Sequence, residues 1–169
     1  MKPEIIAPDY FFRYINLVKE EDLNKALKKN TKQFLKLLKN IPKKKLDFAY
    51  AEGKWTVRQL LQHIIDAERV FAIRALWFAR KDPNGQPGFD ENIWGHNAVV
   101  DKRKWNDMVK EYILLRLSTE LLFKSFTNEN LNSTDLANNN QVSVAALGFI
   151  AAGHVTHHMN VLKERYLGR

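Results

Sequence analysis

Residues 55–80 read WTVRQLLQHIIDAERVFAIRALWFAR and carry the clearest helical signal in the chain. Thr56 followed by Gln59 forms a capping-box pattern, and Trp55 and Leu60 occupy the two positions of a hydrophobic staple. Apolar residues then recur at three- and four-residue spacing. We therefore predict an amphipathic helix from position 57 to about position 80. It must end before DPNGQPG at 82–88, which cannot stay helical.

Three further windows show the same helical period. They predict a helix from about Glu21 to Lys39, a helix from an Asp101 N-cap to about Phe126, and a helix from a Ser143 N-cap to about Tyr166. A shorter helical turn is expected around residues 10–18. No convincing period-two run appears, and the polar, asparagine-rich residues 128–141 are expected to form a loop.

These elements predict an all-α protein. We expect a four-helix bundle with a short extra N-terminal helix and a long connection between the second and third helices, in a single domain over residues 1–169. The helical pattern leaves parallel and antiparallel packing of the helices open.

The composition is that of a packed globular protein, with 45% hydrophobic residues, four Trp and ten Phe. No segment reaches the roughly 18 uninterrupted apolar residues that a membrane span needs. The N-terminus lacks the apolar region of a secretory signal, and the chain has no cysteine. We therefore expect a cytoplasmic protein with no membrane association.

The net charge of +8 comes largely from lysines on one helix. In residues 21–39 they recur at three- and four-residue steps opposite an apolar face, which is typical of a solvated helix surface. Nucleic-acid binding usually adds aromatic residues between the basic ones or arginines on a recognition helix. Neither feature is present, so no nucleic-acid partner is expected.

Three of the five histidines fall on apolar helix faces. His154 and His158 share a stripe with Leu147 and Ala151, and their spacing of four puts both rings on one side of the helix. His63 lies on the apolar stripe of the second helix. His157 falls on a different face, where we expect it at the edge of the site or in solvent, and it would be the substitute ligand if this register were wrong.

A metal site is our interpretation of these three inward histidines. Burying an imidazole without a partner costs roughly 2 kcal/mol, whereas one divalent cation would satisfy a nitrogen of every ring. Asp66 or Glu68 could accept a hydrogen bond from a second ring nitrogen. The alternative is that all three are core histidines with ordinary hydrogen bonds. Val155 follows His154, so the glutamate of the H-E-x-x-H protease motif is missing.

Other polar and aromatic side chains favour structural roles. For Glu68 we favour an ion pair over catalysis, with three candidate partners: Arg69, Arg74 and Arg80. The long connection and its end contribute Phe89, Trp94, His96 and Trp105. We expect the aromatic residues to pack locally rather than wall a pocket, and His96 to bind nothing.

Several motifs together resemble the DinB-like (YfiT/DinB) superfamily of metalloenzymes. The match covers nearly the whole chain and is carried by two motifs, W-[ST]-x-x-x-[LV]-x-x-H at 55–63 and G-H-x-x-H-H at 153–158. Further matching segments are GKWTV at 53–57, HIIDAER at 63–69, PGFD at 87–90, VSV at 142–144 and LKERY at 162–166.

This resemblance implies a four-helix bundle with one divalent metal ion. The family's ligand positions correspond here to His63, His154 and His158, and nickel or zinc is the usual occupant. Family members are often homodimers. Those with assigned chemistry are similar to thiol transferases and isomerases that use bacillithiol, mycothiol or glutathione.

Three functions remain open at this point. The leading hypothesis is a metal-dependent S-transferase that acts on a small-molecule substrate and activates a low-molecular-weight thiol, because a cation held by neutral ligands acidifies an incoming thiol. The alternatives are a metal-dependent small-molecule hydrolase and a non-catalytic metal- or ligand-binding bundle. The pattern predicts no catalytic or substrate-binding residue.

Overall fold

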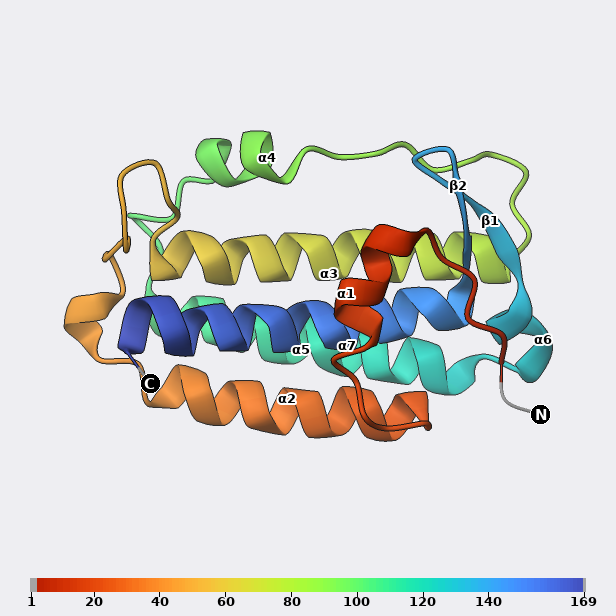
Figure 1. Ribbon diagram of the computed structural model, residues 1–169, viewed down its shortest axis with the longest axis horizontal. Helices are drawn as coiled ribbons and strands as arrows, with labels where there is room; N and C mark the ends of the chain where they lie inside the picture. Colours follow the sequence, from red (N-terminus) through yellow and green to blue (C-terminus); the bar gives the residue numbers. More distant parts are fainter. Residues whose placement is uncertain (1–2, 169) are drawn as a thin grey trace.

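The computed structural model describes residues 3–168, and four long helices dominate it (Figure 1). They are α2 Leu23–Lys39, α3 Val57–Ala79, α5 Trp105–Ser125 and α7 Val144–Val161, which continues into the π-helical segment η3 Leu162–Leu167. A short N-terminal helical unit precedes them, made of η1 Asp9–Phe11 and α1 Phe12–Ile15. The predicted four-helix bundle with an extra N-terminal helix is confirmed. That residues 1–169 form one domain stays a prediction, and residues 1, 2 and 169 lie outside the described part.

The direction of the helices, which the sequence left open, is plain in Figure 1. Helices α3 and α5 run the same way, and α2 and α7 run in the opposite direction. Because α3 and α5 are parallel, the chain must return along the bundle between them. Residues 80–104 make that return, and they include the short helix α4 Glu91–Asn97. The predicted long connection is therefore a crossover that lies over the bundle.

Two of the predicted helix starts are confirmed by their capping contacts. The Thr56 hydroxyl accepts the backbone N–H of Gln59, and the Gln59 side chain accepts the backbone N–H of Thr56. At the start of α7, the Ser143 hydroxyl accepts the N–H of Ala146. These contacts satisfy donors that the first helical turn leaves free.

The predicted start of the third helix was wrong. Asp101 does not cap it, because residues 101–103 form a turn in which the N–H of Arg103 bonds to the carbonyl of Val100. Helix α5 begins at Trp105 instead, after Lys104, which makes no side-chain capping contact. Aspartate is favoured in turns as well as at helix N-caps, and here it lies in a turn.

The expected loop at 128–141 was also wrong. This segment contains α6 Asn128–Asn132 and an antiparallel hairpin of β1 Thr134–Ala137 with β2 Asn140–Ser143. Asn138 and Asn139 connect the strands with φ of 51° and 60°. Two such residues suit a tight hairpin turn, and asparagine tolerates this left-handed backbone. The four-residue strands are too short to show a period.

Helix α1 lies directly on α7 at Gly153. A Cβ atom at this position would stand 2.5 Å from the carbonyl carbon of Tyr14 and closer still to its oxygen. Because those atoms belong to the backbone, only glycine permits the contact. The contact holds Tyr14 beside the C-terminal half of α7.

No helix within residues 3–168 has the length and apolar character needed to cross a bilayer.

Gly153→Ala should therefore destabilise the protein although alanine is the better helix former. We expect the free energy of unfolding to fall by about 1–3 kcal/mol, because α1 must move away from α7. Urea denaturation measures this loss. The control is Gly85→Ala, whose methyl group would meet nothing closer than 3.7 Å and should change stability by less than about 0.5 kcal/mol. Equal stability of the two variants would contradict the close approach.

Candidate metal centre

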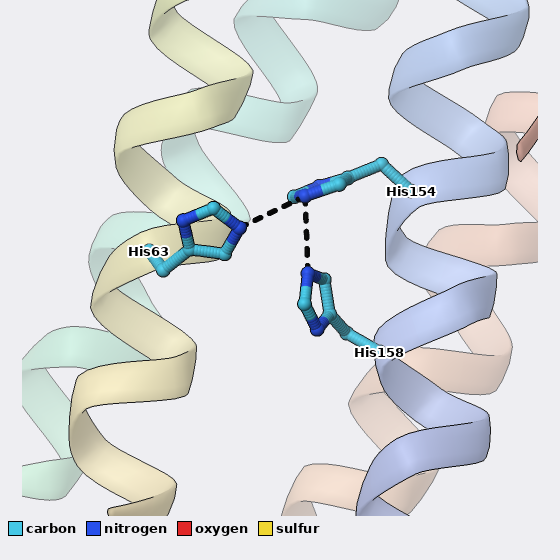
Figure 2. A group of neighbouring side chains, drawn as sticks. All are labelled: His63, His154 and His158. Atoms are coloured by element: carbon cyan, nitrogen blue, oxygen red, sulfur yellow. Dashed lines mark hydrogen bonds between the residues drawn. The ribbon is translucent and has the colours of Figure 1, made fainter. Parts of the chain in front are cut away.

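Three imidazole rings converge inside the bundle, one from α3 and two from α7 (Figure 2). The Nε2 atom of His154 lies 2.9 Å from Nε2 of His63 and 3.0 Å from Nε2 of His158. All three side chains are buried, and their candidate ligand atoms lie within 4.8 Å of one another. The structure thus brings together the three histidines that the two helix stripes selected.

Hydrogen bonding among the rings accounts poorly for this arrangement. In a neutral imidazole, Nε2 carries either one N–H or one lone pair, so it forms one good in-plane hydrogen bond. The Nε2 atom of His154 has two ring nitrogens at hydrogen-bonding distance. A cation among the three nitrogens would accept all three lone pairs at once. The donor set therefore fits a divalent metal better than it fits a closed hydrogen-bond network.

The burial of the rings keeps them in the form that binds metal. Desolvation lowers the pKa of His63 to about 4, with a smaller contribution from the charge of His157. Desolvation also lowers the pKa of His154 and His158 well below the usual value, and the neighbouring histidines add to the effect. All three rings are neutral at pH 7 and offer lone pairs without first losing a proton.

Aromatic side chains enclose the histidines. The Trp55 ring lies 4.6 Å from the His63 ring, and the rings of Tyr14 and Phe71 lie 5.4 and 5.7 Å from that of His154, centre to centre. Such apolar walls lower the local dielectric and strengthen electrostatic interactions inside the site.

The predicted acceptors for the outer ring nitrogens were wrong. The Asp66 carboxylate accepts hydrogen bonds from Gln62 and Arg69, and not from a histidine ring. The Nδ1 atom of His158 is buried without a hydrogen-bond partner among residues 3–168.

Glu68 forms an ion pair, as favoured from the sequence, but with none of the three predicted partners. Its Oε2 atom lies 2.7 Å from Nη2 of Arg116 on α5, and both side chains are fully buried. Helix α5 packs beside α3 in the bundle. The carboxylate is therefore engaged in the core between these two helices.

The two remaining histidines lie outside the cluster. His157 is half-buried, and its ring contacts that of Tyr14 at 5.4 Å between centres. His96 is exposed on α4, and its Nδ1–H donates to the carbonyl of Asn92 at 2.6 Å. Both positions agree with the sequence analysis, which placed His157 at the edge of the site or in solvent and His96 in the long connection.

A pocket of about 380 Å³ opens onto the three rings. Its walls come from α1, α3, α7, the crossover and the hairpin tip, with Tyr14, Trp55, Phe71, Arg74 and Phe89 among the lining residues. The expectation that Phe89 only packs locally was wrong, although its ring does contact that of Trp94. Sequence patterns gave no sign that Tyr14 would line the pocket, because packing between distant segments brings it there. Arg74 was also missed, although its spacing from His63 puts it on the same face of α3.

The chain is similar to several known proteins. The DinB superfamily profile matches residues 26–162. A protein of Bacillus mycoides (strain KBAB4) is 28% identical over 168 residues, covering 91% of this chain and 92% of its own length. A protein of Bacillus cereus is 30% identical over 144 residues, 79% of each chain. Both carry the name "Putative metal-dependent hydrolase".

The fold also resembles a solved structure, that of YfiT from Bacillus subtilis. The TM-score is 0.66 at 18% sequence identity, with 99% of this chain and 93% of the other covered. That protein is described as "a probable metal-dependent hydrolase with an unusual four-helix bundle topology". The parallel pairing of α3 with α5 is thus part of a known bundle architecture.

Proposed function

The chain belongs to the DinB superfamily, and we propose that it is a metal-dependent enzyme whose cation is held by His63, His154 and His158. The observation that carries this proposal is the single Nε2 atom of His154 with two other Nε2 atoms within 3.0 Å. No single tautomer of His154 can form good hydrogen bonds to both neighbouring Nε2 atoms, whereas a cation between the three nitrogens would bind all of them.

Nickel or zinc is the cation we propose. Both accept imidazole nitrogens readily, whereas magnesium and calcium prefer oxygen ligands. The three histidines form the only such cluster of potential ligands found within residues 3–168. Elemental analysis of protein purified without added metal and without a histidine-rich tag identifies the native occupant.

The chemistry we propose is transfer of a low-molecular-weight thiol to an electrophilic small molecule. A divalent cation bound by three neutral nitrogens keeps its charge uncompensated and lowers the pKa of an incoming thiol or water. The aromatic walls formed by Trp55 and Phe71 limit the access of bulk water to the rings. The Tyr14 hydroxyl accepts a hydrogen bond from Arg13 at 2.8 Å and keeps its own proton, since burial raises the pKa of Tyr14. We propose that it donates this proton to the leaving group as the bond from sulfur to the electrophile forms and the bond to the leaving group breaks. The proton lost by the thiol then restores the hydroxyl.

Hydrolysis of a small molecule is the second candidate, and the names of the relatives favour it. The same site would then activate water in place of a thiol. A non-catalytic binding bundle is the third, and it differs from both because it predicts no turnover.

Assays of the metal-loaded and metal-free protein separate these candidates. With a reactive electrophile, we expect conjugation of bacillithiol or glutathione by the loaded protein only, because a cation held by the three histidines would lower the pKa of the thiol. Turnover of esters or amides without thiol would instead support hydrolysis. Absence of metal-dependent turnover in both assays would support the binding bundle.

A homodimer and a cytoplasmic location also stay predictions. Helix α5 exposes a row of large apolar side chains that supports self-association: Ile113, Leu114, Leu117 and Leu121. Light scattering of the purified protein measures the assembly directly.

A further inference from the structure

One face of α3 forms the floor of the histidine pocket. His63, Ala67, Phe71 and Arg74 follow one another at steps of four, four and three residues, and all four line the pocket. This spacing keeps them on one side of the helix. His63 and Arg74 lie 11 positions apart, which corresponds to about 16 Å along the helix axis. The pocket thus has imidazoles at one end, a guanidinium at the other and an apolar floor between them.

Arg74 is a buried cation without an acidic partner. Its residue is 5% exposed. Its Nη2 atom donates to the carbonyl of Pro87 at 2.6 Å, and its guanidinium carbon lies 6.0 Å from the centre of the Phe89 ring. Within residues 3–168, no carboxylate forms an ion pair with it. Burying an unpaired charge is costly, and the guanidinium stays protonated at neutral pH.

The other charged side chains of the pocket do not neutralise it. Arg13 adds a second cation, whose Nη2 atom donates to the Tyr14 hydroxyl. Glu91, an exposed residue of α4, is the one acidic residue among the described residues that line the pocket. Two arginines face one glutamate, so the pocket favours an anionic ligand even before a metal ion is counted.

We propose that the substrate carries a carboxylate that pairs with Arg74, at the opposite end from the atom that approaches the three imidazoles. A guanidinium fork matches a carboxylate in shape, and one buried cation balances its single charge. A phosphate dianion would leave a charge uncompensated. This inference rests on the proposed function only for the role of the imidazole end.

The spacing also sets the length and character of the substrate. A long side chain on a helix leans toward the N-terminus, so Arg74 shortens the 16 Å separation, and the two polar ends of the ligand stand on the order of 10 Å apart. The segment between them lies over Ala67 and Phe71, which favours an apolar middle.

Hydroxamates with a terminal carboxylate test this geometry in the zinc-loaded protein. The probe is suberic monohydroxamic acid, compared by calorimetry with the same molecule ending in a carboxamide. We expect the acid to bind about 10- to 100-fold more tightly, as charge-assisted hydrogen bonds do. Arg74→Gln should bring that ratio close to one, and Arg74→Lys should reduce it. The corresponding pair made from succinic acid should show little preference for the carboxylate, because these shorter molecules cannot reach Arg74 from the imidazole end.

Two further variants show whether the effect belongs to Arg74. Arg69→Gln is the matched control, since Arg69 lies on the same helix but is exposed and pairs with Asp66 and Glu111. It should keep the full preference. A preference that survives Arg74→Gln and disappears in Arg13→Gln would overturn the proposal. If Arg74→Gln does not fold, the length dependence in the wild type decides.

A metal-free arm separates this inference from the proposed function. Suberic acid monoamide and suberamide are compared on metal-free protein by ligand-observed NMR. A preference for the acid that depends on Arg74 supports the inference whatever binds the histidines. Hydroxamates that bind equally to loaded and metal-free protein would contradict only the proposed metal site. An acid-to-amide ratio near one in both arms would overturn the inference.

Discussion

Replacing His63, His154 or His158 by alanine should each abolish stoichiometric metal binding. Each change removes one of three ligands and leaves an incomplete coordination shell. Loss of a residue that merely supports a ligand typically costs 10- to 100-fold in metal affinity, so loss of a ligand should cost more than about 100-fold. Metal content after dialysis, and competition with a chromophoric chelator, measure the effect.

Two other histidines serve as controls for this experiment. His157→Ala removes a half-buried ring one residue away from a proposed ligand, and His96→Ala removes an exposed ring on α4. Both variants should keep most of the metal. Equal loss in His157→Ala would show that the wrong face of α7 had been assigned. A loss in His96→Ala as large as that in His63→Ala would show that the third ligand had been chosen wrongly.

Breaking the buried ion pair between α3 and α5 should destabilise the protein strongly. Glu68→Met and Arg116→Met should each lower the free energy of unfolding by about 3–5 kcal/mol, because each leaves the opposite charge buried and unpaired. The surroundings offer little compensation: Oε1 of Glu68, two nitrogens of Arg116 and the Tyr112 hydroxyl already lack hydrogen-bond partners among the described residues. Burial raises the pKa of the Glu68 carboxyl, and the nearby Arg116 opposes that rise.

A double variant distinguishes the pair from a simple packing effect. Glu68→Met combined with Arg116→Met replaces both charges by apolar side chains of similar length. It should recover most of the lost stability, since apolar replacements of buried ion pairs are often neutral or stabilising. Urea denaturation of all four proteins gives the coupling energy. Losses that simply add in the double variant would mean that the two side chains act independently.

The helix faces were predictable from the sequence because each is a property of one segment. The four-residue step from His154 to His158 puts both rings on one side of α7, and the apolar stripe of α3 does the same for His63. Each apolar stripe indicates which face of its own helix is buried, and the rest of the chain is not needed to recognise it. That these rings bind a cation, and that the cation activates a thiol, stay predictions.

The partners across the bundle were not predictable, because they depend on how helices dock. Arg116 lies 48 positions from Glu68, and nothing in either segment selects the other. Tyr14 reaches the histidines only because Gly153 lets α1 approach α7. The short helix α4 was not predicted, although an aspartate at its N-cap position is a recognisable start signal. Asp90 caps α4 by accepting the N–H groups of Asn92 and Ile93.

The parallel course of α3 and α5 determines which part of the pocket wall can vary. Neighbouring helices that run the same way demand a returning segment, and here that segment supplies Phe89 and Glu91 to the pocket. The three imidazoles lie on the long helices α3 and α7. Part of the pocket wall is instead the crossover, and loops tolerate insertion and substitution better than helices do. Substitutions in this crossover would therefore change the ligands that the pocket accepts and leave the three histidines of α3 and α7 in place.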